Sequence, residues 1–374
     1  MRIGLNATCF NERPSGAKQR FIGIYTEIFS QMPEDDFIIF EPSDCKMDSW
    51  FKELPNIKFI SSPIPSEGRI IKAFKGLFYW PRITKDERLD IFEIFNLPFI
   101  RSSAKKSFVT IHDLRGLGEE YNIFYNIIFK FIFKHALLKA DRVITGSTSI
   151  KNDLKTLEPR CKISVIFNGV HPDLCKPINE IDQYNFKKKY NIHNDFFLTV
   201  GHFEKRKNYA QLINAISLID INSLDKPFVI IGNDNGELSA IRNQIKNLGL
   251  ENRVRLISGL SDHEVNTAYK SAFIFIFPSS YEGFGIPIIE SMAAGIPMIL
   301  SDISVFREVT ENKAIYFEIG EAQSLAEKIE LLYHNEKIRE SMIQYGKERV
   351  TDFSFNKIAA ELKNIYREIS LELK

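Results

Sequence analysis

Short apolar runs alternate with longer helical patterns along the whole chain. Such runs predict buried strands of parallel sheets, because each parallel crossover needs a helix that covers the sheet. In the first half the expected strands are residues 2–6, 37–40, 91–94, 108–111, 142–145 and 163–166. In the second half they are residues 196–200, 228–231, 254–257, 273–277 and 298–300. The alternation therefore predicts an α/β fold.

Length and turn chemistry predict two domains. A chain of 374 residues exceeds what one hydrophobic core usually serves. The alternation breaks at residues 168–172, Asn-Gly-Val-His-Pro, which are turn residues. We therefore expect one domain over residues 1–175 and a second over residues 176–354.

The segment 279–290 reads Ser-Ser-Tyr-Glu-Gly-Phe-Gly-Ile-Pro-Ile-Ile-Glu and sets two carboxylates around a glycine turn that opens a helix. Gly283 and Gly285 let the backbone approach a ligand, and the amides at a helix start attract an anion. Glu282 and Glu290 can both face one crevice, where carboxylates accept hydrogen bonds from sugar hydroxyls. The segment predicts a site for a sugar phosphate. A plain strand-turn-helix joint with two solvated glutamates is the alternative.

Two cations follow the first expected strand of the second half. Arg206 and Lys207 stand at the start of a helix that Asn208 is expected to cap. Arg offers a planar fork and Lys a point charge, and both hold phosphate oxygens. Cations at a helix start oppose the helix dipole, so they predict an anion between themselves and the helix amides. A solvated run of charges is the ordinary alternative.

The first half carries a second candidate anion site. Arg13, Lys18 and Arg20 surround a Pro-Ser-Gly turn that ends at Gly16 and leads into a helix. Arg20 is equally suited to an acceptor phosphate. His112 directly follows an apolar strand, so we expect it to point into a ligand cleft, although a lone histidine in that place is usually structural.

Charge and cysteine content narrow the class of protein. The formal net charge is +1 and no RNA-binding signature is present, which argues against nucleic acid as a partner. Four cysteines without a C-x-x-C pair or zinc-finger spacing indicate a reducing compartment without structural metal. The start MRIGLNATCF resembles a first strand and not a signal peptide, and no apolar window is long enough to span a bilayer. We therefore expect a cytoplasmic protein.

The segment 279–290 resembles the E-x7-E signature of glycosyltransferase family 4, the retaining nucleotide-sugar transferases of the GT-B fold. The likeness covers nearly the whole chain: residues 3–6, 13–16, 109–114, 142–145, 168–170, 200–208 and 353–354 each resemble a family landmark, in the family's order. The triplet Arg-Lys-Asn at 206–208 resembles that of a branch of the family whose members are often mannosyltransferases. Many family members carry Arg where this chain has His202. The resemblance implies two Rossmann-like domains facing across a cleft, with a closing helix at about 355–374 that packs on the first domain.

The resemblance also implies roles for single residues. Arg206 and Lys207 would hold the diphosphate of a nucleotide sugar. Glu290 would bind the ribose, and Glu282 and His112 the transferred sugar. His112, Arg206, Lys207 and Glu282 are thus the expected catalytic residues, and the expected substrate-binding residues are Gly16, Arg20, Ser258, Leu260, Gly283, Phe284, Gly285 and Glu290.

The predicted activity is retaining transfer of a hexose, first of all mannose from GDP-mannose, to a glycan or lipid-linked acceptor in lipopolysaccharide O-antigen assembly. The suitable loops contain no Asp-x-Asp motif, so neither metal nor cofactor is expected, and the leaving phosphate would itself help to deprotonate the acceptor. A GT-B nucleotide-sugar epimerase and a non-catalytic sugar-binding subunit are the alternatives. A dinucleotide-dependent oxidoreductase is disfavoured because the first strand-helix turn lacks G-x-G-x-x-G.

Two segments of the first half are rich in aromatic and basic residues. Residues 69–80 are expected to form a helix in which Lys72 and Lys75 lie beside bulky apolar groups, a composition suited to a lipid surface and equally to packing in the protein. Residues 122–138 predict a strongly apolar helix, for which packing against the sheet is the favoured interpretation. Any membrane contact is expected to be peripheral.

Overall fold

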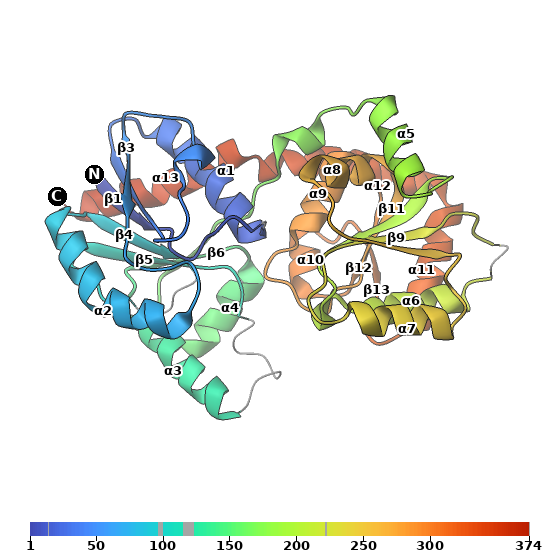
Figure 1. Ribbon diagram of the computed structural model, residues 1–374, viewed down its shortest axis with the longest axis horizontal. Helices are drawn as coiled ribbons and strands as arrows, with labels where there is room; N and C mark the ends of the chain where they lie inside the picture. Colours follow the sequence, from blue (N-terminus) through green and yellow to red (C-terminus); the bar gives the residue numbers. More distant parts are fainter. Residues whose placement is uncertain (14, 96–99, 115–122, 221–222, 374) are drawn as a thin grey trace. The chain divides into compact units, whose positions relative to one another are not determined.

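The computed structural model describes residues 1–13, 15–95, 100–114, 123–220 and 223–373, which form two units (Figure 1). The first unit contains Met1–Gly169 and Phe355–Lys374, and the second contains Val170–Ser354. We expected the boundary after residue 175, and the structure places it after residue 169. Pro14 of the expected glycine loop and Asn122 of the expected apolar helix lie outside the described residues. The predicted fold of two parallel-sheet α/β domains is confirmed.

The first domain is built on a seven-stranded parallel sheet with the strand order β3-β2-β1-β4-β5-β6-β7. Its strands are β1 Arg2–Asn6, β2 Asp36–Glu41, β3 Ile57–Ser61, β4 Ile91–Phe95, β5 Lys106–Ile111, β6 Arg142–Thr145 and β7 Ile163–Val165. The sequence did not predict β3. It is an edge strand with no buried residue, so it lacks the continuous apolar run of a central strand.

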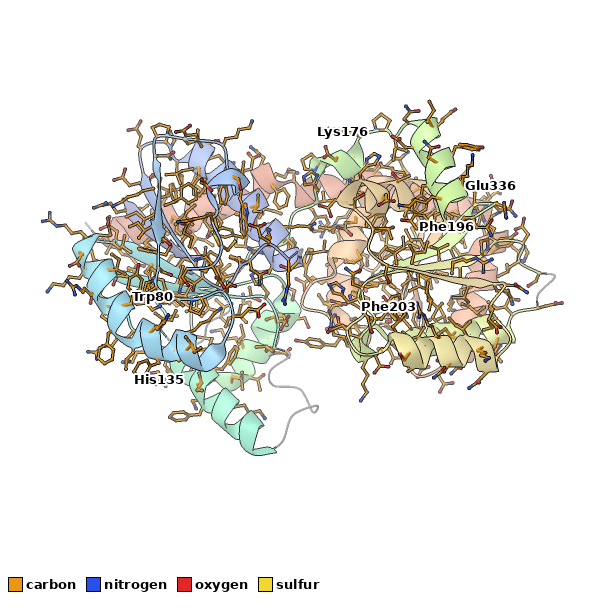
Figure 2. All side chains as sticks on the ribbon, in the orientation of Figure 1. Trp80, His135, Lys176, Phe196, Phe203 and Glu336 are labelled. Carbon is orange, nitrogen blue, oxygen red and sulfur yellow. The ribbon has the colours of Figure 1, made fainter. Side chains whose placement is uncertain are left out.

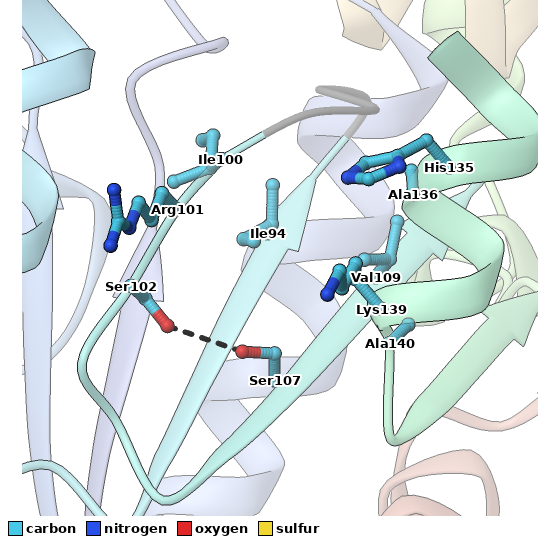
Figure 3. Close-up of a pocket in the computed structure, with 10 residues that line it drawn as sticks. All are labelled: Ile94, Ile100, Arg101, Ser102, Ser107, Val109, His135, Ala136, Lys139 and Ala140. Carbon is cyan, nitrogen blue, oxygen red and sulfur yellow. Dashed lines mark hydrogen bonds between the residues drawn. The ribbon is translucent and has the colours of Figure 1, made fainter. Parts of the chain in front are cut away.

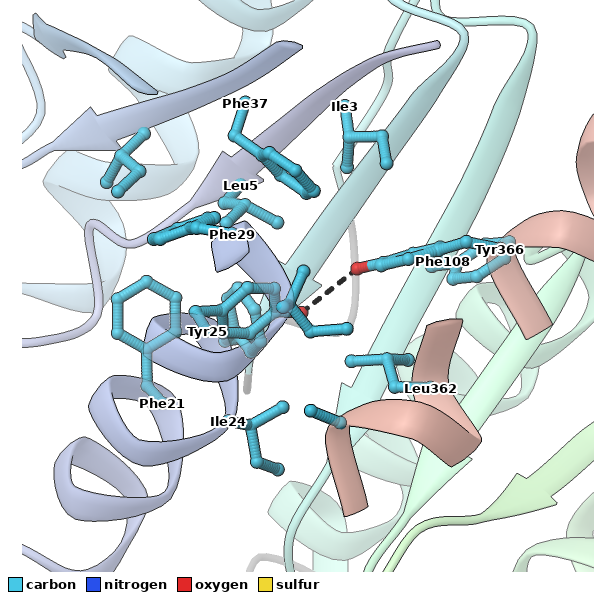
Figure 4. Close-up of a cluster of buried hydrophobic side chains, with 14 of the residues drawn as sticks. Ile3, Leu5, Phe21, Ile24, Tyr25, Phe29, Phe37, Phe108, Leu362 and Tyr366 are labelled. Atoms are coloured by element: carbon cyan, nitrogen blue, oxygen red, sulfur yellow. Dashed lines mark hydrogen bonds between the residues drawn. The ribbon is translucent and has the colours of Figure 1, made fainter. Parts of the chain in front are cut away.

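Helices cover both faces of this sheet (Figure 1). They are α1 Gly16–Gln31, α2 Arg69–Asp86, α3 Ile123–Lys139, α4 Thr148–Leu157 and α13 Phe355–Glu372. Trp80 of α2 packs against Phe40 and Phe92, with ring centroids 5.5 and 5.2 Å apart. The helices α1 and α13 pack on the opposite face, where their apolar side chains meet those of the strands (Figure 4).

The C-terminal helix α13 returns to the first domain, as expected. The ring of Phe355 fills the space beside Gly23 of α1 and Gly169, where an added Cβ would lie only 2.2 Å from the ring. Farther along α13, the Tyr366 hydroxyl donates a 2.5 Å hydrogen bond to Glu93 of β4. Burial raises the pKa of Glu93, and its hydrogen bonds act in the opposite direction. Close packing and a buried polar contact thus both fix α13 to this domain.

The second domain is built on a six-stranded parallel sheet with the order β10-β9-β8-β11-β12-β13. Its strands are β8 Phe196–Val200, β9 Phe228–Ile231, β10 Val254–Ile257, β11 Ala272–Phe277, β12 Met298–Ser301 and β13 Ile315–Phe317. Its helices are α5 Glu180–Lys189, α6 Tyr209–Leu218, α7 Leu238–Asn247, α8 Asp262–Ser271, α9 Ile286–Ala294, α10 Ser304–Val309, α11 Ala322–His334 and α12 Glu336–Arg349. The short edge strand β13 was not predicted. The strand order reverses between β8 and β11, and in such sheets a ligand binds where the carboxyl ends of those two strands meet.

Candidate active site

Two loops meet where the strand order of the second sheet reverses. After β8 the chain forms a 3-10 turn, η4 Lys205–Lys207, and after β11 it runs through residues 278–285 into α9. Because β8 and β11 are paired neighbours, the two loops lie side by side at the carboxyl edge of the sheet. The predicted residues Arg206, Lys207 and Glu282 therefore come together from distant parts of the sequence, and Gly283 follows in the same loop.

Glu282 lies between two cations. Its Oε1 accepts a hydrogen bond of 2.7 Å from Nζ of Lys207 and lies 2.6 Å from Nη1 of Arg206. Nη1 of Arg206 also donates to the carbonyl of Tyr281 at 3.1 Å, and its Nη2 lies 2.5 Å from Oε1 of Glu204. The side chains of Lys207 and Glu282 are only 7% and 11% exposed. The cluster is therefore largely withdrawn from water.

Burial and pairing set the charges of this cluster. Burial alone would raise the pKa of Glu282, but Lys207 and Arg206 outweigh it and hold this pKa below its ordinary value. Burial lowers the pKa of Lys207, and the attraction of Glu282 opposes that shift. Buried charges persist only when they are paired. Lysine has three N–H donors and arginine five, so the two cations retain the capacity to bind a further anion beside Glu282.

Glu290 lies in α9, and its Oε2 accepts a hydrogen bond of 2.7 Å from the hydroxyl of Tyr269 in α8. Burial raises the pKa of Glu290, whereas the hydrogen bond from Tyr269 lowers it. Tyr269 is completely buried, so it fixes the carboxylate from within the core. The second oxygen of such a carboxylate can accept hydrogen bonds from two vicinal hydroxyls of a sugar.

The start of α9 depends on Gly285. Its φ is +104°, a conformation that strains any residue with a side chain. A Cβ at this position would also lie 3.0 Å from Ile288 and 3.1 Å from Phe306. The neighbouring Phe284 is buried, and its ring packs 5.9 Å from that of Phe353. The side chain of Phe284 therefore anchors the loop, and only its backbone is suited to contact a ligand.

Ser258 and Leu260 follow β10 at the same edge of the sheet, but β10 lies two strands away from β8. The Ser258 hydroxyl donates to the carbonyl of Gly232 at 2.6 Å, and the amide of Gly259 donates to Asn233 at 3.0 Å. The structure therefore places these two predicted residues at the same edge of the sheet as the charged cluster, but two strands away from β8 and outside the hydrogen bonds of the cluster.

In the first domain, Gly16 lies at the start of α1 and His112 lies directly after β5. Gly16 opens α1, whose N-cap Ser15 accepts a hydrogen bond from the amide of Lys18 at 3.2 Å. His112 follows β5, and its Nε2 is buried without a hydrogen-bond partner among the described residues. Burial, together with the nearby Arg20, lowers the pKa of His112 to about 3. The imidazole is therefore neutral at pH 7.

Arg20, which was predicted to bind substrate, is a buried residue. It is 4% exposed, and its Nη2 donates to the carbonyl of Ile166 at 2.7 Å. Arg13 pairs with Glu67 at 3.0 Å, and Lys18 lies over the ring of Trp50. The cations near the loop at Gly16 thus have partners inside the first domain.

Three details of the second domain differ from expectation. Asn208 does not cap α6 with its side chain: it has a left-handed φ of 52°, and its amide donates to Gln211 at 2.6 Å. The contacts of Glu204 and Tyr269 were not predicted. The pairing of Glu204 with Arg206 could have been predicted, since the two residues are two positions apart. The contact of Tyr269 could not, because its partner Glu290 belongs to another helix.

Comparison with known proteins gives two family matches. The model described as Glycosyltransferase Family 4 matches residues 38–174, and the one described as Glycosyl transferases group 1 matches residues 180–349. The chain is 31% identical over 231 residues to the O-antigen chain mannosyltransferase RfbU of Salmonella typhimurium, an alignment that covers 61% of this chain and 60% of that protein.

A second relative is matched over most of its length. It is the N-acetylgalactosamine-N,N'-diacetylbacillosaminyl-diphospho-undecaprenol 4-alpha-N-acetylgalactosaminyltransferase of Campylobacter jejuni, 27% identical over 93% of this chain and 95% of that protein. Among solved structures, the sucrose-phosphate synthase of Thermosynechococcus elongatus superposes with a TM-score of 0.76 at 19% identity, covering all of both chains. That superposition supports the fold.

Proposed function

The chain belongs to the group 1 glycosyl transferases of glycosyltransferase family 4, and on that premise we propose that it transfers a hexose from a nucleotide diphosphate sugar to a glycan or lipid-linked acceptor in surface polysaccharide assembly. The names of the relatives from Salmonella typhimurium and Campylobacter jejuni support such an acceptor.

One observation carries the proposal: the buried Lys207, the partly buried Arg206 and the carboxylates of Glu282 and Glu290 lie where the strand order reverses. In the proposed complex, Arg206 and Lys207 bind the diphosphate, which needs positive charge because it departs as an anion. Glu290 binds the ribose and Glu282 the transferred sugar. Buried cations stabilise a leaving anion more than solvated ones, because water does not screen them.

The proposed reaction retains the configuration of the sugar. The bond between the anomeric carbon and the phosphate oxygen breaks, the acceptor oxygen bonds to that carbon on the same face, and the acceptor proton passes to the leaving phosphate. In this scheme Arg206 and Lys207 neutralise the diphosphate. The neutral His112 donates a hydrogen bond to the donor sugar. Catalysis then rests on positioning and electrostatics.

For the donor we propose GDP-mannose first; the Salmonella relative is named a mannosyltransferase, which supports the sugar of this proposal. We further propose that transfer needs no divalent metal, because Arg206 and Lys207, although paired with Glu204 and Glu282, keep N–H donors of two cationic groups for the diphosphate. Addition of EDTA should then leave turnover unchanged.

We also propose a cytoplasmic protein that contacts the membrane through α2. Among the described residues, no helix combines the length and apolarity needed to cross a bilayer. The α2 face, defined here as Ile71, Phe74, Lys75, Phe78 and Lys85, points away from the sheet, and Phe74 and Phe78 are 71% and 72% exposed. Exposed aromatic residues among lysines suit an anionic lipid surface.

A donor screen tests the proposed function. The full chain is mixed with GDP-, UDP-, ADP- and TDP-sugars, and the unfolding temperature and slow donor hydrolysis are measured. One donor class should raise the unfolding temperature, because a ligand that binds only the folded state stabilises it. Epimerised sugar in the absence of acceptor would instead identify an epimerase. If no donor binds, the proposed function is wrong.

A further inference from the structure

A pocket of about 390 Å3 lies in the first domain between α3 and the strands β4 and β5 (Figure 3). Its floor is formed by Ile94 and Val109, which are paired neighbours on the two strands. Ala136 of α3 and Ala140, which directly follows the helix, lie above this floor, and the Ala140 amide donates to the Ala136 carbonyl at 3.0 Å. Their small side chains leave the space of the pocket, at whose bottom Ile94 and Val109 are 2% and 5% exposed. The volume falls within the range of small-molecule sites.

The polar groups of the pocket are basic or already paired. Lys139 and His135 point from α3 into the pocket, whereas Arg101 at its rim points away (Figure 3). The hydroxyls of Ser102 and Ser107 lie 3.1 Å apart and bond to each other. Among the residues that the structure describes, none that lines the pocket is acidic and none forms an ion pair with Lys139. The pocket thus combines an apolar floor with an uncompensated ammonium group.

We propose that this pocket binds the phosphate end of a membrane lipid, with the phosphate at Lys139 and the first methylenes of the chain over Ile94 and Val109. A free inorganic anion would gain nothing from the apolar floor, and a neutral chain would gain nothing from the lysine. An amphiphile that carries both parts uses both features.

The surroundings of the pocket favour a lipid as the source of this ligand. The α2 face lies on the same side of the sheet, because Phe92, against which Trp80 of α2 packs, and Ile94 of the pocket floor are two positions apart on β4. On α3, Phe131 is 73% exposed, and Lys130 and Lys134 are exposed near it. The inference rests on the proposed lipid-linked acceptor, and it adds a lipid site in the first domain.

The test measures binding of monomeric dodecyl phosphate to the full chain by calorimetry. Inorganic phosphate supplies the head alone, and dodecyl maltoside supplies the same chain on a neutral head. We expect dodecyl phosphate to bind at least about tenfold more tightly than either, since only it makes both kinds of contact. The Lys139→Gln variant should lose about tenfold in affinity, whereas Lys134→Gln, the same change outside the pocket on the same helix, should bind like the wild type.

A filling variant, Ala140→Leu, keeps Lys139 but occupies the space above the floor, so it should also weaken dodecyl phosphate binding. Equal losses in Lys139→Gln and Lys134→Gln, or equal affinity for inorganic phosphate, would overturn the proposal. Undiminished binding by a folded Ala140→Leu protein would do the same. Stabilisation by the sugar donor is measured on the same variants and should not change, so failure of this inference is separable from failure of the proposed function.

Discussion

Nζ of Lys207 lies 2.7 Å from Oε1 of Glu282, although 75 positions separate the two residues. The sequence predicted an anion beside the cations at 206 and 207, and the structure places a carboxylate of the chain itself there. A donor diphosphate would therefore join an existing ion pair. Because the cations are already positioned, little reorganisation is needed when the ligand binds.

Removal of either cation should impair transfer. Lys207→Ala or Arg206→Ala should weaken donor binding and lower kcat by about 10²–10³-fold, as loss of a preorganised electrostatic group does. Lys205→Ala is the matched control, because Lys205 belongs to the same turn and is exposed. Steady-state kinetics and donor titration measure both effects. Full activity in both site variants would contradict the phosphate assignment.

Substitution of Glu290 and of Glu282 should affect different kinetic constants. Glu290→Ala should raise the Kd for the nucleotide, whereas Glu282→Ala should act more on kcat. Tyr269→Phe removes only the hydroxyl that holds Glu290 and should weaken nucleotide binding by about tenfold, the usual effect of losing a hydrogen bond to a charged group. Tyr345→Phe is the control, because it also removes one tyrosine hydroxyl, which donates to the carbonyl of Thr310 at 2.8 Å. Identical, purely binding effects of both glutamate variants would refute this division of roles.

Gly285→Ala should damage the loop that carries Glu282. The substitution forces a side chain into a φ of +104° and toward Ile288 and Phe306, at a cost of about 1–3 kcal/mol. Gly236 has a similar φ of +101°, but a Cβ there would meet no atom within 4 Å. Gly236→Ala is therefore the control that measures the cost of the backbone conformation alone. Denaturant unfolding and kcat are compared in the two variants. Equal stability and equal turnover would show that the close packing at Gly285 is unimportant.

His112 should make the protein sensitive to acid. Its pKa is about 3 in the folded state and 6.5 ordinarily, so between these values the unfolded chain binds a proton that the folded ring does not. Stability should therefore fall as the pH drops from 6.5 toward 3, by at most about 1.4 kcal/mol per pH unit. Urea unfolding at several pH values should show a shallower slope for His112→Gln. The exposed His193→Gln control should keep the wild-type slope, and three identical slopes would argue against a buried neutral His112.

The α2 face should bind anionic lipid. Phe74→Ser combined with Phe78→Ser should reduce binding to phosphatidylglycerol vesicles at least about tenfold, because two exposed aromatic groups no longer enter the interface. Ile181→Ser with Tyr184→Ser, at positions of α5 that are 63% exposed, is the control. Lys72 and Lys75 are unsuited to this test, since their ammonium groups donate to the carbonyls of Thr8 at 3.2 Å and Pro63 at 2.8 Å. Unchanged vesicle binding by the Phe74 and Phe78 double variant would contradict the proposed membrane contact of α2.

Much of the fold could be predicted because its signals are local. Central strands of parallel sheets are buried on both faces, so β11 appears as an unbroken apolar run and β8 as one interrupted only by Thr199. The edge strands β3 and β13 escaped prediction because one is partly exposed and the other has three residues. The order of the predicted motifs also placed Lys207 and Glu282 after strands, where a ligand site was expected.

By itself, the sequence determined the two α/β domains, the glycine turn before α9 and the identity of the charged residues at the strand ends. Only the tertiary structure decided their partners: Glu282 with both cations, Tyr269 with Glu290, and Arg20 with the carbonyl of Ile166 in the core. Local patterns report the neighbours of a residue along the chain, whereas these contacts depend on which strands become neighbours in the sheet. Pairing of β8 with β11 is a property of the whole domain, and it creates the charged cluster.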